Sequence, residues 1–418
     1  MKKSTDRIIL VTVRGPDGPG ITAKLTEIIA QGAGVRLLDI EQTVVHRKLL
    51  LSLLLAFPET KREPEQVLKE MLFAARGLGV DLSFEVFDSS FFIEPTSTHQ
   101  YAVTCLGREV GAAPLSRIAQ ALADRGVNIE RIGKLTRASL NCVELLVRAA
   151  RPLDHRRLSQ ELLALATELG IDIAIQPADL LRRAKRLIVF DMDSTLIQTE
   201  VIDELGHEAG VEKKMRAITA KTMAGGWAFA DSLQARVKLL RGLPVAALER
   251  VYRRIRFTNG AEHLLHVLAH LGFKTALISG GFTFFTERLR ERLQLDYAFA
   301  NTLEITNDRL TGRVTGDIVD GARKALLLTT IAQSEKISLD QVVAVGDGAN
   351  DLPMLARAGL GIAFHAHERV RRQAAHGLSP HQGLDTILYL LGISEADQAT
   401  LKPVARGSLG NGRNIFYE

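Results

Sequence analysis

Alternating apolar and polar positions in the N-terminal part of the chain predict a small α/β unit. Apolar Ile21, Leu25 and Ile28 recur at helical spacing, directly after the glycine-rich segment GPDGPG. The expected elements, in chain order, are a strand at 8–13, a tight loop at 15–20, a helix from Ile21, strands at 35–46 and 48–57, a helix at 63–76 and a strand at 81–87. The predicted order is βαββαβ.

The same order recurs further along the chain. The elements expected there are a strand at 101–107, a helix from Leu115, strands in NIERIGKLT and NCVELLVRA, a helix at 152–169 and a strand from Ile171. QGAGVRLLDIEQ in the first pass corresponds to DRGVNIERIGKL in the second, which indicates an internal repeat. We therefore expect two βαββαβ domains, at 5–90 and 98–178.

Strands and helices alternate again from residue 184 to residue 396, which predicts a larger α/β domain with a parallel sheet. Residues 178–186 are expected to form a connecting helix, and a helical insertion at about 202–258 is typical of a cap over a pocket. The glycine-rich segment at 397–418 is expected to be a loose tail.

Composition favours a globular protein: of 418 residues, 46% are hydrophobic and 24% are charged. The longest apolar run, at 49–57, is much shorter than the roughly 20 residues that a membrane span needs, so we expect a core strand and no membrane partner. No secretory leader is visible, and we expect a cytoplasmic protein.

Charge and cysteine content argue against a nucleic-acid-binding protein and against a disulfide-bonded one. The net charge is +5, but the arginines are scattered rather than gathered with aromatic residues, so no nucleic-acid partner is expected. Cys105 and Cys142 do not form a C-x-x-C pair, and we expect two buried free thiols. His365, His367 and His376 lie in a polar run and are interpreted as surface residues.

The candidate chemistry begins where the strand Leu187–Phe190 ends. Asp191 and Asp193 follow it directly, and ligands collect outside the carboxyl ends of strands in parallel sheets. A pair of helix-capping residues is the alternative, although a cap needs only one of the two acids.

Three later segments repeat this placement of polar groups. Ser279 and Gly280 end a strand over Lys274–Ile278, and a hydroxyl beside bare backbone N–H groups suits a phosphate oxygen. A predicted helix carries Lys324, which by itself is typical of a solvent-facing residue. The last strand ends at Asp347 in the segment GDGAND, where Asn350 and Asp351 could equally form an Asx-rich turn.

Together the motifs DMDST, SGG, Lys324 and GDGAND resemble the haloacid dehalogenase superfamily over about 185–395. The resemblance implies a Rossmann-like domain with a helical cap, and phosphomonoester hydrolysis through an aspartyl-phosphate. The residues to which it gives roles are Asp191 as nucleophile, Asp193 as acid and base, Ser279, Gly280 and Lys324 around the phosphoryl group, Asn350 as an orienting side chain, and Asp191, the Asp193 carbonyl, Asp347 and Asp351 around Mg²⁺.

Within the cap segment, Glu200 and the phrase FADSLQARV resemble the phosphatases that act on O-phosphoserine, in the last step of serine biosynthesis. The resemblance implies that Arg236 binds the substrate's carboxylate, that Glu200 binds its ammonium, and that Met223 and Phe229 shield the site. From the residues alone, a surface arginine and core packing remain the alternatives. Three other functions also stay open: hydrolysis of another phosphomonoester, phosphoryl transfer to an alcohol, and an amino-acid sensor whose α/β part is an inert binding platform or a phospho-receiver.

The two N-terminal repeats, within about 5–178, resemble ACT domains, which are ferredoxin-like modules that commonly bind amino acids. The resemblance implies a homodimer with L-serine as an effector near Asp17 and Gly18, in the loop GPDGPG. The second repeat has GREVGAAP at that place, so equivalent sites are not expected. The alternative is that GPDGPG is only a turn and that the repeats only assemble the protein.

Overall fold

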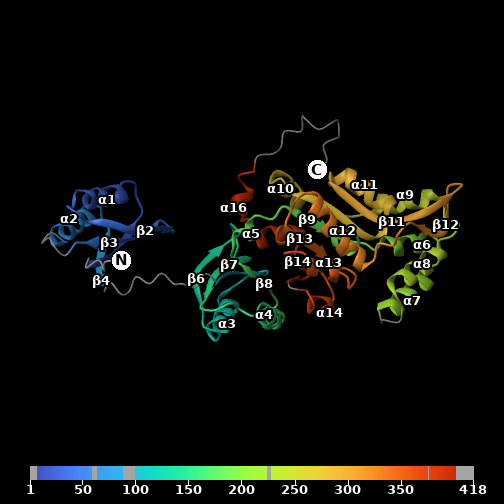
Figure 1. The fold of residues 1–418 in the computed structure, drawn as a ribbon, viewed down its shortest axis with the longest axis horizontal. Helices are drawn as coiled ribbons and strands as arrows, with labels where there is room; N and C mark the ends of the chain where they lie inside the picture. Colours follow the sequence, from blue (N-terminus) through green and yellow to red (C-terminus); the bar gives the residue numbers. More distant parts are fainter. Residues whose placement is uncertain (1–6, 59–63, 88–98, 224–226, 375, 402–418) are drawn as a thin grey trace, which may run out of the picture. The chain divides into compact units, whose positions relative to one another are not determined.

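The structure, a computed structural model, describes residues 7–58, 64–87, 99–223, 227–374 and 376–401 (Figure 1). The chain divides into two compact units, residues 1–96 and 97–418. No helix among the described residues is long and apolar enough to cross a membrane.

The first unit has the predicted βαββαβ order. Its elements are β1 (Arg7–Pro16), α1 (Ile21–Gln31), β2 (Arg36–Val45), β3 (Lys48–Phe57), α2 (Pro64–Gly77) and β4 (Asp81–Phe87). They build an antiparallel sheet in the order β2-β3-β1-β4. Strand β1 continues into the predicted loop, because Gly15 and Pro16 still pair with Leu49 and Lys48. The apolar run at 49–57 is the core strand β3, as predicted.

The second repeat opens the second unit. Its elements are β5 (His99–Leu106), α3 (Ala112–Ala123), β6 (Val127–Lys134), β7 (Cys142–Ala149), α4 (His155–Leu169) and β8 (Asp172–Pro177). The sheet order β6-β7-β5-β8 matches that of the first repeat. Cys105 and Cys142 are buried free thiols, as expected, and burial raises the pKa of the Cys105 thiol to about 12.

A seven-stranded sheet carries the candidate site, in the order β12-β11-β10-β9-β13-β14-β15. Its strands are β9 (Leu187–Phe190), β10 (Lys274–Phe282), β11 (Tyr297–Thr306), β12 (Arg309–Thr315), β13 (Val342–Gly346), β14 (Leu360–Phe364) and β15 (His376–Leu378). All neighbours pair in parallel except β11 and β12, which form an antiparallel hairpin. The central strand β9 is completely buried, which explains its uninterrupted apolar sequence.

Helices cover both faces of this sheet. Their bounds are α10 (Ala261–His270), α11 (Thr283–Leu293), α12 (Gly321–Ser334) and α13 (Leu352–Arg357). Ile188 of β9 packs in one core cluster with residues of α10 and α11, whereas Leu187 packs in another with residues of α12 and α13. The alternation of side chains along one strand therefore builds the two cores of a three-layer domain.

Four helices form the predicted insertion between β9 and β10: α6 (Val201–Glu208), α7 (Glu212–Met223), α8 (Phe229–Leu239) and α9 (Val245–Arg254). The predicted connecting helix at 178–186 is shorter, a single turn α5 (Leu180–Arg183). The remaining short helices are α14 (Glu368–Arg371), α15 (Ile387–Leu390) and α16 (Glu395–Gln398). Most of the predicted tail, from residue 402, lies outside the described residues.

The second repeat packs tightly against the seven-stranded domain. Buried Asp172 of β8 accepts hydrogen bonds from the backbone N–H and the hydroxyl of Ser379, at 3.0 and 2.9 Å. Gln176 donates to the Leu390 carbonyl at 3.0 Å, and Arg182 forms a buried ion pair with Glu144. Because Leu106, Cys142 and Ala174 of this repeat also join the larger domain's core, the two share one hydrophobic interior.

Candidate active site

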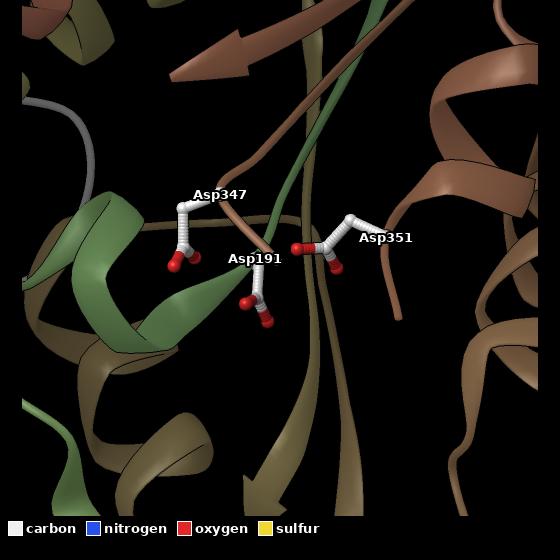
Figure 2. A group of neighbouring side chains, drawn as sticks. All are labelled: Asp191, Asp347 and Asp351. Atoms are coloured by element: carbon white, nitrogen blue, oxygen red, sulfur yellow. The ribbon is translucent and has the colours of Figure 1, made fainter. Parts of the chain in front are cut away.

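The carboxyl ends of adjacent parallel strands bring the acidic residues together. Asp191 follows β9 and Asp347 follows β13, and these strands are neighbours; the Asp191 N–H donates to the Val345 carbonyl at 2.9 Å. Asp351 opens α13 four residues later. Figure 2 shows the three carboxylates converging on one small space, and one oxygen of each lies within 4.8 Å of the others. The strand order therefore assembles the acidic cluster.

Lys324 is a completely buried lysine within this cluster, not a solvent-facing one. Its Nζ lies 2.6 Å from Asp191 Oδ1 and 2.7 Å from Asp351 Oδ1. Helix α12 brings it there, after Asp320 caps the helix by accepting from the Arg323 N–H at 2.8 Å. Burial by itself would lower the pKa of Lys324, but the charges of Asp191 and Asp351 outweigh it and raise the pKa above its usual value. Lys324 therefore carries a positive charge into the site.

Asp193 lies in the tight turn Met192–Leu196 between β9 and the cap. Its Oδ1 accepts from the Val201 N–H at 2.9 Å, which ties it to the start of α6. Ser194 has a left-handed backbone, with φ of 56°, and its hydroxyl donates to Glu200 Oε1 at 2.9 Å. Neither side chain caps this turn itself, but the Asp193 carboxylate accepts from the first N–H of α6, so the capping alternative holds in part for Asp193 and not for Asp191.

The SGG motif wraps around Asp193 from β10. We predicted that this strand ends at Ser279, but β10 continues to Phe282, because Phe282 pairs with Asn301 after a register shift. The Gly281 N–H donates to the buried Ser279 hydroxyl at 2.9 Å. A Cβ on Gly281 would lie 3.0 Å from Asp193 Oδ2, so the absence of a side chain lets the two segments approach.

Three carboxyl groups of the site have raised pKa values, which favours their uncharged forms. Burial raises the pKa of Asp347 to about 8, and the charges of Asp191 and Asp351 add to this effect. Burial, followed by the charges of Glu200 and Asp191, raises the pKa of Asp193 well above its usual value. Burial and Asp351 also raise the pKa of Asp191, while Lys324 opposes them. A carboxyl at the position of Asp193 is therefore suited to carry a proton near neutral pH.

The donor set fits a hard divalent cation. Asp191, Asp347 and Asp351 offer only oxygen atoms, which is the ligand type that Mg²⁺ prefers. Thr195 donates to Asp347 Oδ1 at 3.1 Å, and the Gly348 N–H donates to Asp351 Oδ2 at 2.9 Å. Because both oxygens of Asp351 already have donors, Asp191 and Asp347 have the more available lone pairs.

Glu200 and Phe229 belong to the helical insertion and contact the seven-stranded domain. Glu200 accepts from Ser194, next to Asp193. A Cβ on Gly280 would lie 2.8 Å from Phe229 Cζ, so the Phe229 ring closes against the SGG segment. Met223 ends α7, but its side chain lies outside the described part of the chain.

Arg236 is half-buried on α8, and its Nε donates weakly to the Ser232 carbonyl at 3.4 Å. Burial lowers the pKa of Arg236, and the charges that oppose this effect are those of Asp203, Glu200 and Asp193. The negative charges that act on Arg236 therefore come from other segments of the chain and not from its own helix. A surface arginine with neighbours only on its own helix is therefore a poor description.

The remaining residues named from the sequence lie in a turn, in the first unit and in an edge strand. Asn350 is half-buried in the turn before α13, and a Cβ on Gly348 would lie 2.2 Å from its Oδ1. Asp17 and Gly18 belong to the first unit: the Asp17 N–H donates to the Arg47 carbonyl at 2.9 Å, and nothing lies within 4 Å of a Cβ on Gly18. His376, interpreted as a surface residue, is buried in β15. That interpretation was wrong because a polar run concealed a short edge strand.

Sequence reasoning missed several residues that hold the site. Buried Asn301 donates to the Gly280 carbonyl at 2.8 Å and accepts from the Val319 N–H at 2.8 Å, which fixes the backbone of the SGG segment. Thr258 donates to the Thr195 carbonyl at 2.7 Å. A single asparagine or threonine in a strand or loop carries no spacing signal, so only the three-dimensional contacts reveal these roles.

Comparisons with known families match each part of the chain. Residues 188–356 match the family model of haloacid dehalogenase-like hydrolases. Residues 7–85 and 97–176 each match a family model of the ACT domain. The order of two ACT domains and one hydrolase domain therefore agrees with the resemblance drawn from the sequence.

Relatives similar over nearly the full length specify the family further. The chain is 42% identical to a phosphoserine phosphatase of Streptomyces coelicolor, covering 97% of this chain and 96% of the relative. It is 40% identical to one of Mycobacterium tuberculosis, covering 93% and 94%. Among solved structures, a probable phosphoserine phosphatase from Vibrio cholerae is 32% identical, with a TM-score of 0.56 over 76% of this chain and 94% of that one. The chain therefore belongs to the phosphoserine phosphatase family.

Proposed function

We propose that the enzyme hydrolyses O-phospho-L-serine to L-serine and phosphate, with Asp191 as the nucleophile and with Mg²⁺. The observation that carries this proposal is the ion pair between Lys324 and Asp191, in a cluster with Asp347 and Asp351 at the carboxyl end of the sheet. Phosphate monoesters are among the slowest compounds to hydrolyse without a catalyst, so a nucleophile, an acid and a charge clamp all contribute.

Asp191 attacks phosphorus and forms an aspartyl-phosphate, which splits one difficult displacement into two easier ones. Its position at the end of β9, beside the ammonium of Lys324, supports this role. Lys324 also offsets negative charge that develops on the phosphoryl oxygens. Ser279 and the backbone N–H groups of the SGG segment offer further donors to these oxygens.

Asp193 protonates the leaving serine oxygen and later removes a proton from the attacking water. Its raised pKa and its position between Asp191 and the cap support this role. The hydrogen bond from the Val201 N–H at 2.9 Å fixes the orientation of the carboxyl. Because this donor is uncharged, it does not form an ion pair with the carboxyl. The cap helix that contacts the substrate thereby also orients the acid.

Asp191, Asp347 and the carbonyl of Asp193, with Asp351 beside them, would hold Mg²⁺, and the bound ion would neutralise phosphate charge. The oxygen-only cluster supports this assignment. Asp351 also anchors Lys324 at 2.7 Å, so this aspartate positions the ammonium as well as bordering the metal. Asn350 orients the phosphoryl group from the turn before α13.

The cap selects an amino-acid phosphate. Arg236 binds the carboxylate and Glu200 binds the ammonium, while Phe229 and Met223 exclude water. The charges of Glu200 and Asp193 act on the pKa of Arg236, which supports a site with one positive and one negative partner, and a zwitterion presents one charge to each. Substrates that lack either charge should be hydrolysed less efficiently.

The first unit is proposed to bind L-serine near Asp17 and Gly18 and to join two copies of the chain. Every residue of edge strand β2 is exposed, among them Leu37, Ile40 and Val45, and exposed apolar edge strands favour pairing. The free N–H groups at the start of α1 and the open space at Gly18 support a ligand there.

Phosphate release from a panel of phosphoesters tests the catalytic proposal. O-phospho-L-serine should be preferred over glycerol phosphate, the reaction should require Mg²⁺, and L-serine should accumulate with phosphate. Equal rates on both esters would contradict the amino-acid clamp. Accumulation of a new phosphoester in the presence of an alcohol would favour phosphoryl transfer instead of hydrolysis.

Calorimetry on the full-length protein, titrated with L-serine, tests the effector proposal. The Asp17→Ala variant should lose the heat of L-serine binding to the first unit and keep phosphatase activity. If Asp17→Ala bound L-serine as the parent does, the loop would be only a turn. Sedimentation should show a homodimer, and a monomer at micromolar concentration would contradict the assembly.

A further inference from the structure

Asn301 is a buried residue whose side-chain amide bonds three backbone groups. It lies on β11, where it pairs with Phe282. Its Nδ2 donates to the carbonyls of Gly280 and Gly281, at 2.8 and 3.3 Å, and its Oδ1 accepts from the Val319 N–H at 2.8 Å. Two carbonyls on one side and one N–H on the other allow a single orientation of the amide.

The two glycines need an anchor of this kind because the sheet does not supply one. The regular pairing between β10 and β11 is interrupted between Ile278 and Phe282. Glycine adopts a wider range of backbone angles than other residues, so two successive glycines without an anchor would be poorly defined. The amide of Asn301 replaces the missing strand partner and sets the direction of both glycine carbonyls.

This anchor determines where the hydroxyl of Ser279 points. In a trans peptide the C=O and the N–H point in opposite directions. The peptide between Gly280 and Gly281 has its C=O bonded to Asn301 and its N–H bonded to Ser279 Oγ, at 2.9 Å. Because that oxygen accepts from Gly281, its own hydrogen is left for another acceptor, and none of the described residues provides one. The hydroxyl is therefore oriented to donate to a ligand.

The Ser279 hydroxyl also lies beside the catalytic turn. A Cβ on Gly281 would lie 3.0 Å from Ser279 Oγ and 3.0 Å from Asp193 Oδ2. Both oxygens therefore border the same small space, which only a glycine leaves open.

The other end of the Asn301 amide holds the start of α12. Val319, which donates to Asn301, immediately precedes Asp320, the residue that caps this helix. The Lys324 N–H donates to the Asp320 carbonyl at 2.8 Å, which begins the hydrogen-bond ladder of the helix. One amide therefore joins the segment that carries the hydroxyl to the helical turn that carries the ammonium.

We propose that Asn301 is a positioning residue that directs the Ser279 hydroxyl and the first turn of α12 toward one phosphoryl group. This inference rests on the proposed function, in which Ser279 and Lys324 both bind the phosphoryl oxygens. Donors that are fixed before the reaction need no reorganisation when charge develops on these oxygens. Asn301 contacts no reacting atom, so it acts only through the groups that it holds.

The test compares Asn301→Ala with the parent enzyme, with O-phosphoserine as substrate and orthovanadate as inhibitor. Orthovanadate can adopt the five-coordinate geometry of phosphoryl transfer, so its affinity reports on donors that are aligned for that geometry. We expect kcat to fall about 30-fold and KM to change less than about twofold, because such donors act mainly in the transition state. The inhibition constant of orthovanadate should rise by a similar factor to the fall in kcat.

Two further variants separate positioning from folding. Asn301→Ser, in which a hydroxyl and a water can replace part of the amide, gives the same comparison if Asn301→Ala does not fold. Gln176→Ala is the matched control, because Gln176 is another buried amide that donates to a backbone carbonyl, that of Leu390 at 3.0 Å. It should lower the melting temperature, as Asn301→Ala does, and leave the inhibition constant of orthovanadate unchanged.

A double-mutant cycle with Ser279→Ala tests the path through the hydroxyl. The loss of kcat in Ser279→Ala/Asn301→Ala should be clearly smaller than the product of the two single losses, because both changes act through one hydroxyl.

Two sets of outcomes would overturn the inference for different reasons. If the parent released no L-serine from O-phosphoserine, or if Ser279→Ala matched the parent, the proposed phosphoryl site would fall, and the role of Asn301 with it. If Ser279→Ala lost activity but Asn301→Ala kept the parent's inhibition constant for orthovanadate, or if the two losses multiplied, the proposed function would stand. The amide of Asn301 would then only support the fold, and the inference alone would be wrong.

Discussion

The ammonium of Lys324 lies 2.6 Å from Asp191 Oδ1, with both side chains removed from solvent. The lysine comes from α12 and the aspartate from the end of β9, so the contact connects a helix on one face of the sheet with its central strand. Removing Lys324 leaves the buried carboxylates of Asp191 and Asp351 without their cation, and such a loss is larger than the net contribution of the ion pairs.

Lys324→Met should therefore affect stability and activity together. We expect a loss of about 3–5 kcal/mol in the free energy of unfolding, and a fall in turnover of at least about 10³-fold, because Asp191 and Asp351 lose their cation. Urea unfolding and phosphate release measure the two effects. Adding Asp351→Asn should recover part of the stability but none of the activity; full stability of Lys324→Met alone would show that the pair is not structurally important.

Mg²⁺ should stabilise the enzyme more at high pH than at low pH. Burial raises the pKa of Asp347 from 3.8 to about 8, so without metal the protein loses stability as pH rises between these values and through the higher one, where this carboxyl ionises in the folded state. Protons and Mg²⁺ compete for the same oxygens, and the rise in melting temperature with Mg²⁺ should be larger at about pH 9 than at about pH 6. In Asp347→Asn the dependence should become weaker, because Asp191, whose pKa is also raised, still exchanges a proton for the metal; an equal rise at both pH values in the parent would argue against metal binding at this cluster.

Gly280→Ala should impair substrate binding through Phe229. The added Cβ would lie 2.8 Å from Phe229 Cζ, so the ring must move away from the SGG segment. We expect kcat/KM for O-phosphoserine to fall about tenfold, since overpacking typically costs about 1–3 kcal/mol. Gly133→Ala is the control, because a Cβ there meets nothing within 4 Å. Recovery of activity in Gly280→Ala/Phe229→Leu would support the steric cause, whereas equal activity of both alanine variants would refute it.

The second ACT domain should stabilise the phosphatase domain through Asp172. Asp172→Ala removes the acceptor for two hydrogen bonds from Ser379 and should lower the free energy of unfolding by about 2–4 kcal/mol. Glu109→Ala, an exposed change in the same domain, should have little effect. Calorimetric melting distinguishes the two; if Asp172→Ala melted like the parent, the contact would be dispensable.

The sequence predicted those parts of the site that depend on strand ends. Asp191 and Asp347 were found because a buried apolar run that stops at an acid is typical of a strand whose end faces a ligand. Lys324 was found only because the order of the motifs along the chain resembles a known family. The two ACT domains were predicted because the same βαββαβ pattern occurs twice along the chain. These features are local or periodic, so they can be recognised in the sequence without knowledge of the fold.

Contacts between distant segments could not be predicted in this way. Asn301 and Thr258 support the site through single side chains, and the contact between Asp172 and Ser379 joins residues 207 positions apart. Strand β10 runs through two glycines that ordinarily end a strand, because pairing with Asn301 resumes beyond them. In each case tertiary pairing, rather than local propensity, decides the outcome.

Acid-quenched Asp193→Asn enzyme, mixed with O-phosphoserine and Mg²⁺ and mapped by peptide mass spectrometry, tests the central claim most directly. Loss of the acid and base slows both steps by about 10²–10⁴-fold, so a phosphoenzyme formed in the first step should persist long enough to be trapped. The account predicts one phosphoryl group on the peptide that contains Asp191, and none in Asp191→Asn. A phosphoryl group on any other residue, or substantial turnover by Asp191→Asn, would contradict it.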